Sequence, residues 1–246
     1  MRFDLVFTMA SDLNWDQLEG TALVVGQGGI GKALETMLAS KAPKLQLLQA
    51  GRQGPFVLNI CSEQSLDQLK KELRNREPLR LVINTAGWLH RNGMGPEKRL
   101  QSVNALGLEE SFRVNAFGPI LLAKAVEDAL GHGKTAWFAS LSARVGSIGD
   151  NQSGGWYSYR AAKAAQNQLL RTLAIEWQRR RPNVTVSLIH PGTTATNLSE
   201  PFRSAVSDAN LFSPERAADQ ILNVIAKQTP VASGSFLAWN GQTIPW

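Results

Sequence analysis

The sequence predicts a doubly wound α/β fold, in which one parallel sheet of about seven strands carries helices on both faces. Two observations predict it. Short apolar runs rich in β-branched residues alternate with helical patterns along most of the 246 residues, and a glycine-rich turn joins the first such run to the first helix. Repeated βα alternation requires parallel strands joined by right-handed crossovers. Ligands in such folds bind beyond the carboxyl ends of the strands, so the residues that follow each strand are the candidate site residues.

The elements follow from local pattern. Strands are expected at residues 21–25, 45–49, 56–60, 79–84, 135–140, 184–189 and 234–239, and helices at 31–42, 65–75, 110–130, 157–178 and 213–228. Leu66, Leu69 and Leu73 recur on one face of the second helix, as an amphipathic helix requires. Ser213 and Pro214 suit the N-cap and first position of the last helix.

The chain is expected to form one domain. Neither an internal repeat nor a low-complexity linker interrupts it, so we expect a single dinucleotide-binding domain at residues 20–246 behind an N-terminal extension at residues 1–19. That extension lacks the pattern of a secretion signal. The one cysteine, Cys61, excludes an intramolecular disulfide and fits a reducing compartment, so we expect a cytoplasmic protein.

Charge and hydropathy exclude other classes. No apolar run reaches the roughly 18 residues of a membrane span. The net charge is +6, but its one dense run, residues 179–181, stands at an expected helix end, where basic side chains favour the helix dipole. We therefore expect neither a membrane nor a nucleic-acid partner. The positive charge suits an anionic cofactor, and no cluster of His, Cys and carboxylates has the spacing of a metal site.

The turn "GQGGIGK" after the first strand admits three interpretations. Gly26, Gly28 and Gly31 match GxGxxG, and Gly26, Gly29 and Gly31 match a second dinucleotide-binding spacing. In both, glycines let the backbone approach a pyrophosphate at the helix N-terminus. The third, a phosphate loop of an NTPase, lacks a hydroxyl for Mg²⁺ because Ala33 follows the lysine. The remaining structural alternative is a tight turn without a ligand.

The end of the second strand favours NADP(H) over NAD(H). An NAD site uses an acidic residue there for the ribose 2′-hydroxyl, yet no acidic residue stands between Gln46 and Phe56. Arg52 does, and a guanidinium can hold a 2′-phosphate in a bidentate manner. An arginine exposed on a loop without a ligand is the alternative.

From residue 21 onward, the chain resembles the short-chain dehydrogenase/reductase family, and within it the C-factor-like and sniffer-like carbonyl reductases. The resemblance rests on ordered motifs: "NTAG" at 84–87, "VNAFGP" at 114–119, "YRAAK" at 159–163 and "HPGTTAT" at 190–196, with "PEK" at 96–98 and "GGWYSYR" at 154–160 typical of the narrower branch. It implies cofactor contacts from Gly26, Gln27, Gly29, Ile30, Gly31, Arg52, Asn59, Asn84, Ala86, Gly87, Tyr159, Lys163, Pro191, Gly192, Thr194 and Thr196.

The resemblance implies an oxidoreductase that transfers hydride between the nicotinamide and a small carbonyl or alcohol substrate. The reaction also requires a proton donor. A tyrosine can serve if a nearby lysine lowers its pKa toward neutrality. The chain has only two tyrosines, and Tyr159 alone has a lysine, Lys163, one helical turn away, whereas Tyr157 has Ala161. Asn115 matches the family asparagine that supports a proton relay.

The serine that polarises the carbonyl is harder to assign. The family pattern Ser-Ser-x-x-Gly, counted back from Gly146, places Ala143 at the catalytic position. We expect Ser142 to act there, which needs a local shift of one residue; Ser147 is the other candidate. The alternative function is a cofactor-binding regulator or signalling protein with little turnover, which the C-factor-like resemblance favours and the incomplete serine match supports.

Other features complete the expectations. Trp88 and Trp156 flank motifs of the cleft and form either an aromatic pocket or core, while His90 and His190 are expected to be structural. The resemblance implies a homodimer or homotetramer through the two long helices, residues 109–130 and 157–178.

Overall fold

The computed structural model describes residues 13–91, 93–205 and 207–246 and shows a seven-stranded sheet in which every strand pairs in parallel. The spatial order is β3-β2-β1-β4-β5-β6-β9. The strands are β1 (Gly20–Val25), β2 (Leu45–Gly51), β3 (Phe56–Val57), β4 (Leu79–Asn84), β5 (Ala136–Leu141), β6 (Val184–His190) and β9 (Ser235–Ala238). The predicted fold class is confirmed.

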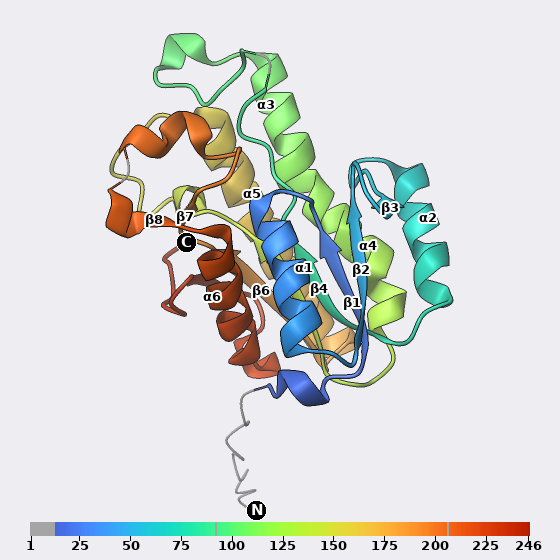
Figure 1. Cartoon of the computed structure of the whole chain (residues 1–246). Coiled ribbons are helices and arrows are strands. Elements are labelled where there is room, and N and C mark those ends of the chain that lie inside the picture. The colour runs from blue at the N-terminus through green and yellow to red at the C-terminus, as the bar shows by residue number, and fades with distance from the viewer. Residues whose placement is uncertain (1–12, 92, 206) are drawn as a thin grey trace, which may run out of the picture.

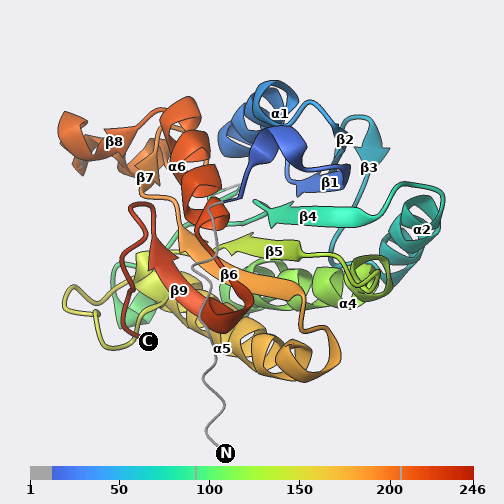
Figure 2. The same cartoon turned by 90° about the horizontal axis from the view of Figure 1, so that it is seen from below.

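Helices cover both faces of the sheet (Figures 1 and 2). One layer holds α1 (Gly29–Lys41) and α6 (Pro214–Ala226), which pack on each other. The other holds α2 (Glu63–Arg74), α4 (Gly118–Leu130) and α5 (Tyr157–Arg180). Ser213 caps α6 by accepting a hydrogen bond from the Arg216 N–H, and Pro214 is its first residue, as predicted.

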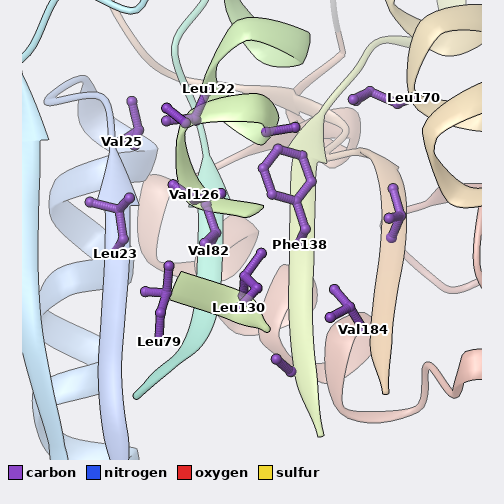
Figure 3. Close-up of a cluster of buried hydrophobic side chains, with 14 of the residues drawn as sticks. Leu23, Val25, Leu79, Val82, Leu122, Val126, Leu130, Phe138, Leu170 and Val184 are labelled. Atoms are coloured by element: carbon purple, nitrogen blue, oxygen red, sulfur yellow. The ribbon is translucent and has the colours of Figure 1, made fainter. Parts of the chain in front are cut away.

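Two hydrophobic clusters, one on each face, hold the layers together. Strand β5 contributes side chains to both clusters, because successive side chains of a strand point to opposite faces. Phe138 lies in one cluster and Trp137 in the other. Figure 3 shows Phe138 among side chains of β1, β4 and α4. The indole of Trp177 on α5 meets Phe138 edge to face at 6.0 Å.

The predicted helix at 110–130 is helical throughout, but it begins earlier, at Ala105, and it contains a π-helical turn that was not predicted. The structure has α3 (Ala105–Phe112), a π-helical turn (Arg113–Phe117) and then α4. Pro119 is the physical reason, because it has no N–H to donate to the carbonyl of Asn115 four residues earlier. A widened turn at this point places Asn115 in the π-helical segment.

Three smaller departures concern the strands and the N-terminal segment. The strand expected at 56–60 ends at Val57, because only its first two residues pair with β2. A second small sheet, β7 (Thr193–Thr194) with β8 (Leu211–Phe212), was not predicted. Residues 1–12 of the expected extension lie outside the described residues, while Leu18 is buried in the core. The division at residue 19 stays a prediction.

Candidate active site and cofactor-binding cleft

The order of the sheet reverses between β1 and β4, where doubly wound folds bind their ligands. Gly26 follows β1 with a φ of +109°, and a Cβ there would lie 2.3 Å from the Thr85 Oγ1 that follows β4. A Cβ on Gly31 would lie 2.1 Å from the carbonyl oxygen of Gly26. These two positions therefore require glycine, and the turn packs directly against the end of β4.

Helix α1 starts at this turn with its N-terminus free of a side-chain cap. Gly28 is the N-cap residue, and a Cβ built on it would meet nothing within 4 Å. The first N–H groups of a helix have no partner within the helix and carry a positive partial charge. The turn therefore fits the pyrophosphate of a dinucleotide, for which it offers backbone donors and open space.

The loop after β2 is tied to the glycine turn. Gln27 accepts a hydrogen bond on Oε1 from the Gln53 N–H at 2.8 Å, and its side chain occupies the space left by Gly51 and Gly54. Arg52, between these glycines, is exposed. Its guanidinium is therefore accessible to an anion at this end of the sheet.

Two other expected cofactor residues contact the protein's own backbone. Asn59 is exposed and accepts a hydrogen bond on Oδ1 from the Cys61 N–H at 3.0 Å. Asn84 is buried; its Oδ1 accepts from the Ala86 N–H at 3.1 Å. Asn84 thus shapes the turn at Ala86 and Gly87 from inside.

The segment 191–196 lies against the start of α1. A Cβ on Gly29 would lie 2.9 Å from the methyl carbon of Thr196. Gly192 has a φ of +78°, and a Cβ on it would lie 2.4 Å from the ring of Phe212. Thr194, in β7, is buried. The structure thus brings together the two glycine-containing motifs that the sequence separates by more than a hundred and fifty residues.

Tyr159 and Lys163 lie in the first two turns of α5 and are both buried. The Lys163 Nζ lies 5.8 Å from the centroid of the Tyr159 ring. Burial raises the pKa of the Tyr159 phenol and lowers the pKa of the Lys163 ammonium to about 7. Burial thus disfavours the charged form of both side chains, and the expectation that the lysine lowers the tyrosine pKa stays a prediction.

Asn115 joins the π-helical turn to the segment after β4. Its Nδ2 donates to the Trp88 carbonyl at 2.8 Å, and its Oδ1 accepts from the Trp88 N–H at 2.9 Å. Both atoms of the amide are thus occupied by one residue's backbone. Trp88 itself is buried.

The hydroxyl of Ser142 points into the protein. It is 4% exposed and donates to the Asn167 Oδ1 on α5 at 2.6 Å. Ala143, the next residue, is half-buried and has no hydroxyl. Ser147 is also buried, and its Oγ accepts from the Asp150 N–H at 3.0 Å. Both candidate serines thus have partners inside the protein.

Aromatic side chains surround Tyr159. The Trp156 ring lies 6.1 Å from the Tyr159 ring and 4.9 Å from that of Phe202. Trp156 precedes α5 with a φ of +54°, which is costly for a non-glycine residue. Its N–H donates to the Glu97 carbonyl, and the buried Glu97 carboxylate accepts from the Ser158 N–H at 3.1 Å. Sequence reasoning noted "PEK" as a motif but missed this contact with α5.

A cavity of about 400 Å³ lies beside these residues. Its lining includes Lys98, Val145, Ser153, Gly154, Gly155, Trp156 and Arg160. His90 and His190, which were expected to be structural, have different surroundings. The His90 Nε2 lies 3.1 Å from the Asn197 carbonyl oxygen, while His190 ends β6 with a buried Nδ1 that has no hydrogen-bond partner among the described residues. Within the described part of the chain, no His, Cys, Asp and Glu side chains form a metal-binding group.

Comparisons with known proteins agree with this geometry. Residues 20–207 match the family model described as short chain dehydrogenase. The chain is 32% identical over 192 residues to 1-hydroxy-2-glutathionyl-2-methyl-3-butene dehydrogenase of Rhodococcus sp. (strain AD45), covering 77% of this chain and 78% of that one. It is 33% identical over 171 residues to C-signal of Myxococcus xanthus, covering 69% and 93%.

Solved structures share the fold. The NADPH-bound carbonyl reductase from chicken fatty liver superposes with a TM-score of 0.73 at 23% identity, over 93% of this chain and all of that one. The carbonyl reductase Sniffer of D. melanogaster gives a TM-score of 0.73 at 20% identity, with the same coverage.

The chain belongs to the short-chain dehydrogenase/reductase family, whose enzymes are oxidoreductases with a Rossmann-type NAD(P)-binding domain. The predicted family and enzyme class are thereby confirmed, with C-signal and the Sniffer carbonyl reductase among its relatives and structural neighbours. In the described part of the chain, no helix combines the length and apolar character needed to cross a bilayer.

Proposed function

We propose that the protein is an NADP(H)-dependent oxidoreductase that interconverts a small carbonyl compound and its alcohol, with Tyr159 as the acid/base. The single observation that carries the proposal is the buried Tyr159–Lys163 pair, whose lysine donates to the Leu141 carbonyl at the carboxyl end of β5, the edge of the sheet at which the glycine turn fits a dinucleotide. The NADPH named in the chicken carbonyl reductase structure agrees with the cofactor.

The proposed cofactor contacts come from the glycine turn, the loop after β2 and the segment after β6. Backbone N–H groups at the start of α1 would hold the pyrophosphate, and Arg52 a 2′-phosphate. Thr194 and Thr196 would close over it from the opposite segment, and Lys163 would reach the nicotinamide ribose. Bound NADPH supplies the hydride that reaches the carbonyl carbon.

The protein's own residues handle the proton. In reduction, the Tyr159 hydroxyl donates its proton to the carbonyl oxygen as that oxygen gains negative charge, and in oxidation the phenolate takes a proton from the alcohol. Burial raises the tyrosine pKa, so Tyr159 holds its proton at neutral pH, as reduction requires. A charged Lys163 would favour the phenolate left after proton transfer.

We propose Ser142 for the polarisation of the carbonyl. To reach a substrate, its hydroxyl would exchange the Asn167 contact for the carbonyl oxygen. Asn115 would act through the Trp88 backbone that it holds.

The substrate and the assembly follow from exposed and aromatic side chains. Trp156 and Phe202 beside Tyr159 favour an apolar or aromatic carbonyl compound. Phe117 and Ile175 are 51% and 43% exposed on the π-helical turn and α5, which supports a homodimer or homotetramer through these helices. We propose no nucleic-acid or membrane partner and a cytoplasmic location.

A second candidate function is a cofactor-binding regulator with little turnover. The occupied Ser142 hydroxyl and the hydroxyl-free Ala143 favour it. The experiment that separates the two follows NADPH oxidation at 340 nm over a panel of aldehydes, ketones and quinones, alongside NADPH binding by fluorescence. Turnover of any substrate class well above the background supports the reductase, and tight NADPH binding with no turnover over the whole panel supports the regulator.

A further inference from the structure

A buried polar chain links Lys163 to the turn that follows β4. The Lys163 Nζ donates to the Gln166 Oε1 at 2.9 Å and to the Leu141 carbonyl at 3.0 Å. The Gln166 Nε2 donates to the Ser140 Oγ at 3.0 Å. The Asn84 Nδ2 donates to the same Ser140 oxygen at 3.0 Å.

We propose that Gln166 is a positioning residue that holds the Lys163 ammonium in place for the proposed reaction. The inference rests on the proposed function for its role in catalysis, but the contact itself stands on the geometry. No motif of the sequence draws attention to Gln166, which lies three residues beyond the Tyr-x-x-x-Lys pattern.

The amide of Gln166 has one orientation that fits. As placed, its oxygen faces the ammonium and its Nε2 donates both to Ser140 and to the Leu141 carbonyl, the latter at 3.2 Å. Turning the amide over would set N–H groups against the ammonium and an oxygen against a carbonyl oxygen. Both contacts would then be repulsive, so the surrounding acceptors fix the oxygen toward Lys163.

These contacts also determine how many N–H donors of the Lys163 ammonium stay available for another partner. An ammonium has three N–H donors and no acceptor. Two of the three are taken by Gln166 and Leu141, and one remains for a further partner. Gln166 is fully buried, so water does not replace its oxygen if the side chain is shortened or made apolar.

Gln166 therefore affects the charge of Lys163. An acceptor on the ammonium favours the charged form and opposes the effect of burial, which lowers the lysine pKa to about 7. Replacing the amide by a hydrocarbon should lower that pKa further, and replacing it by a carboxylate should raise it. The two changes thus act in opposite directions at one position.

The elements packed against α5 carry other titratable groups, among them His190 at the end of β6. Tyr159 lies on the same helix. From the adjoining segments come Arg144, whose guanidinium lies 2.9 Å from the Asp150 carboxylate, and Arg113, 3.9 Å from that of Glu110. At the start of α5, the Glu97 carboxylate accepts from Ser158. Strand β5 itself presents the Leu141 carbonyl and the Ser140 hydroxyl rather than a charge.

The test compares Gln166→Leu and Gln166→Glu with wild type, and Gln168→Leu serves as the matched control. Gln168 lies on the same helix but is exposed, with an amide that donates to the Thr172 Oγ1 at 3.3 Å. The Lys163 pKa is measured by NMR on lysine-labelled protein, with Lys163→Arg to assign the signal. The pH profile of kcat/KM is measured on the best substrate of the panel.

We expect Gln166→Leu to lower the Lys163 pKa by about one unit or more and Gln166→Glu to raise it by a similar amount. The kcat/KM profile should shift in the same directions, and Gln168→Leu should change neither quantity. An unchanged Lys163 pKa in both Gln166 variants would overturn the proposal, as would equal shifts in the control.

Two further measurements keep the outcome interpretable. If Gln166→Leu does not fold, Gln166→Met keeps a similar volume and loses the same oxygen, so the same pKa shift is expected of it. If wild type shows no turnover on any substrate, the reductase proposal fails, whereas the NMR titration still decides whether Gln166 sets the charge of Lys163.

Discussion

Replacing Gly31 by alanine tests the cofactor turn most sharply, because the structure gives the size of the clash. The new Cβ would lie 2.1 Å from the Gly26 carbonyl oxygen, whereas ordinary contact begins near 3.4 Å. The backbone of the turn must therefore move by more than an ångström. Forced overpacking of this kind costs about 1–3 kcal/mol.

For a domain of this length, that cost corresponds to a fall in Tm of roughly 2–12 °C, at about 2–4 °C per kcal/mol. NADPH affinity should fall as well, since the same turn carries the backbone donors of α1. The measurements are thermal unfolding by circular dichroism and fluorescence titration with NADPH. Gly28→Ala is the control for stability, because its Cβ meets nothing within 4 Å. A Gly31→Ala protein that melts with wild type and binds NADPH equally would refute the close packing.

Two further predictions concern charge. Arg52→Ala should weaken NADPH binding by roughly 10- to 150-fold, the equivalent of about 1.5–3 kcal/mol for hydrogen bonds to a charged group, and should leave NADH binding nearly unchanged; isothermal titration of both cofactors checks this, and equal losses would contradict the role. His190 should make the fold sensitive to acid, because burial lowers its folded-state pKa to about 4 from a usual value near 6.5. The unfolded chain then binds the extra proton first, so this stability is complete above about pH 6.5 and is lost as the pH falls toward 4, by up to about 3 kcal/mol. Urea unfolding of wild type and His190→Asn between pH 4 and 7.5 measures it, and parallel slopes for the two proteins would show that another group is responsible.

The sheet could be predicted from the sequence because its strands are defined by local pattern. β1, β4, β5 and β6 are apolar runs that the structure buries almost completely, and each ends within two residues of the predicted position. The π-helical turn at residues 113–117 was not predicted, although Pro119 is the signal that explains it. The pattern of apolar residues continues across this turn, so periodicity alone does not reveal it.

Part of the candidate site could likewise be predicted from local spacing, and part could not. Tyr159 and Lys163 are one turn apart on a helix, so spacing alone pairs them. The contacts of Gln166 with Ser140 and of Glu97 with Ser158 join residues 26 and 61 positions apart. Local sequence patterns do not predict such contacts, since they depend on how α5 packs against β5 and against the loop that follows β4.

The Ser142 hydroxyl shows a further limit. Counting from the motif left Ser142 and Ala143 as alternatives, and the pleat of β5 decides which side chain faces α5. Ser140 and Ser142 both point toward that helix. Ser140 accepts a hydrogen bond from the Gln166 Nε2, and Ser142 donates one to the Asn167 Oδ1. Register within a strand is set by the packing of its two faces, which a motif count does not include.

The central claim is that Tyr159 exchanges the proton of a carbonyl reduction, and Tyr159→Phe tests it most directly. Phenylalanine keeps the ring that packs against Trp156 and removes only the hydroxyl. We expect kcat for carbonyl reduction to fall by roughly 10²- to 10⁴-fold, the usual contribution of general acid catalysis, while the Kd for NADPH stays within a few-fold of wild type. Turnover by the variant within tenfold of wild type, at unchanged NADPH affinity, would contradict the claim.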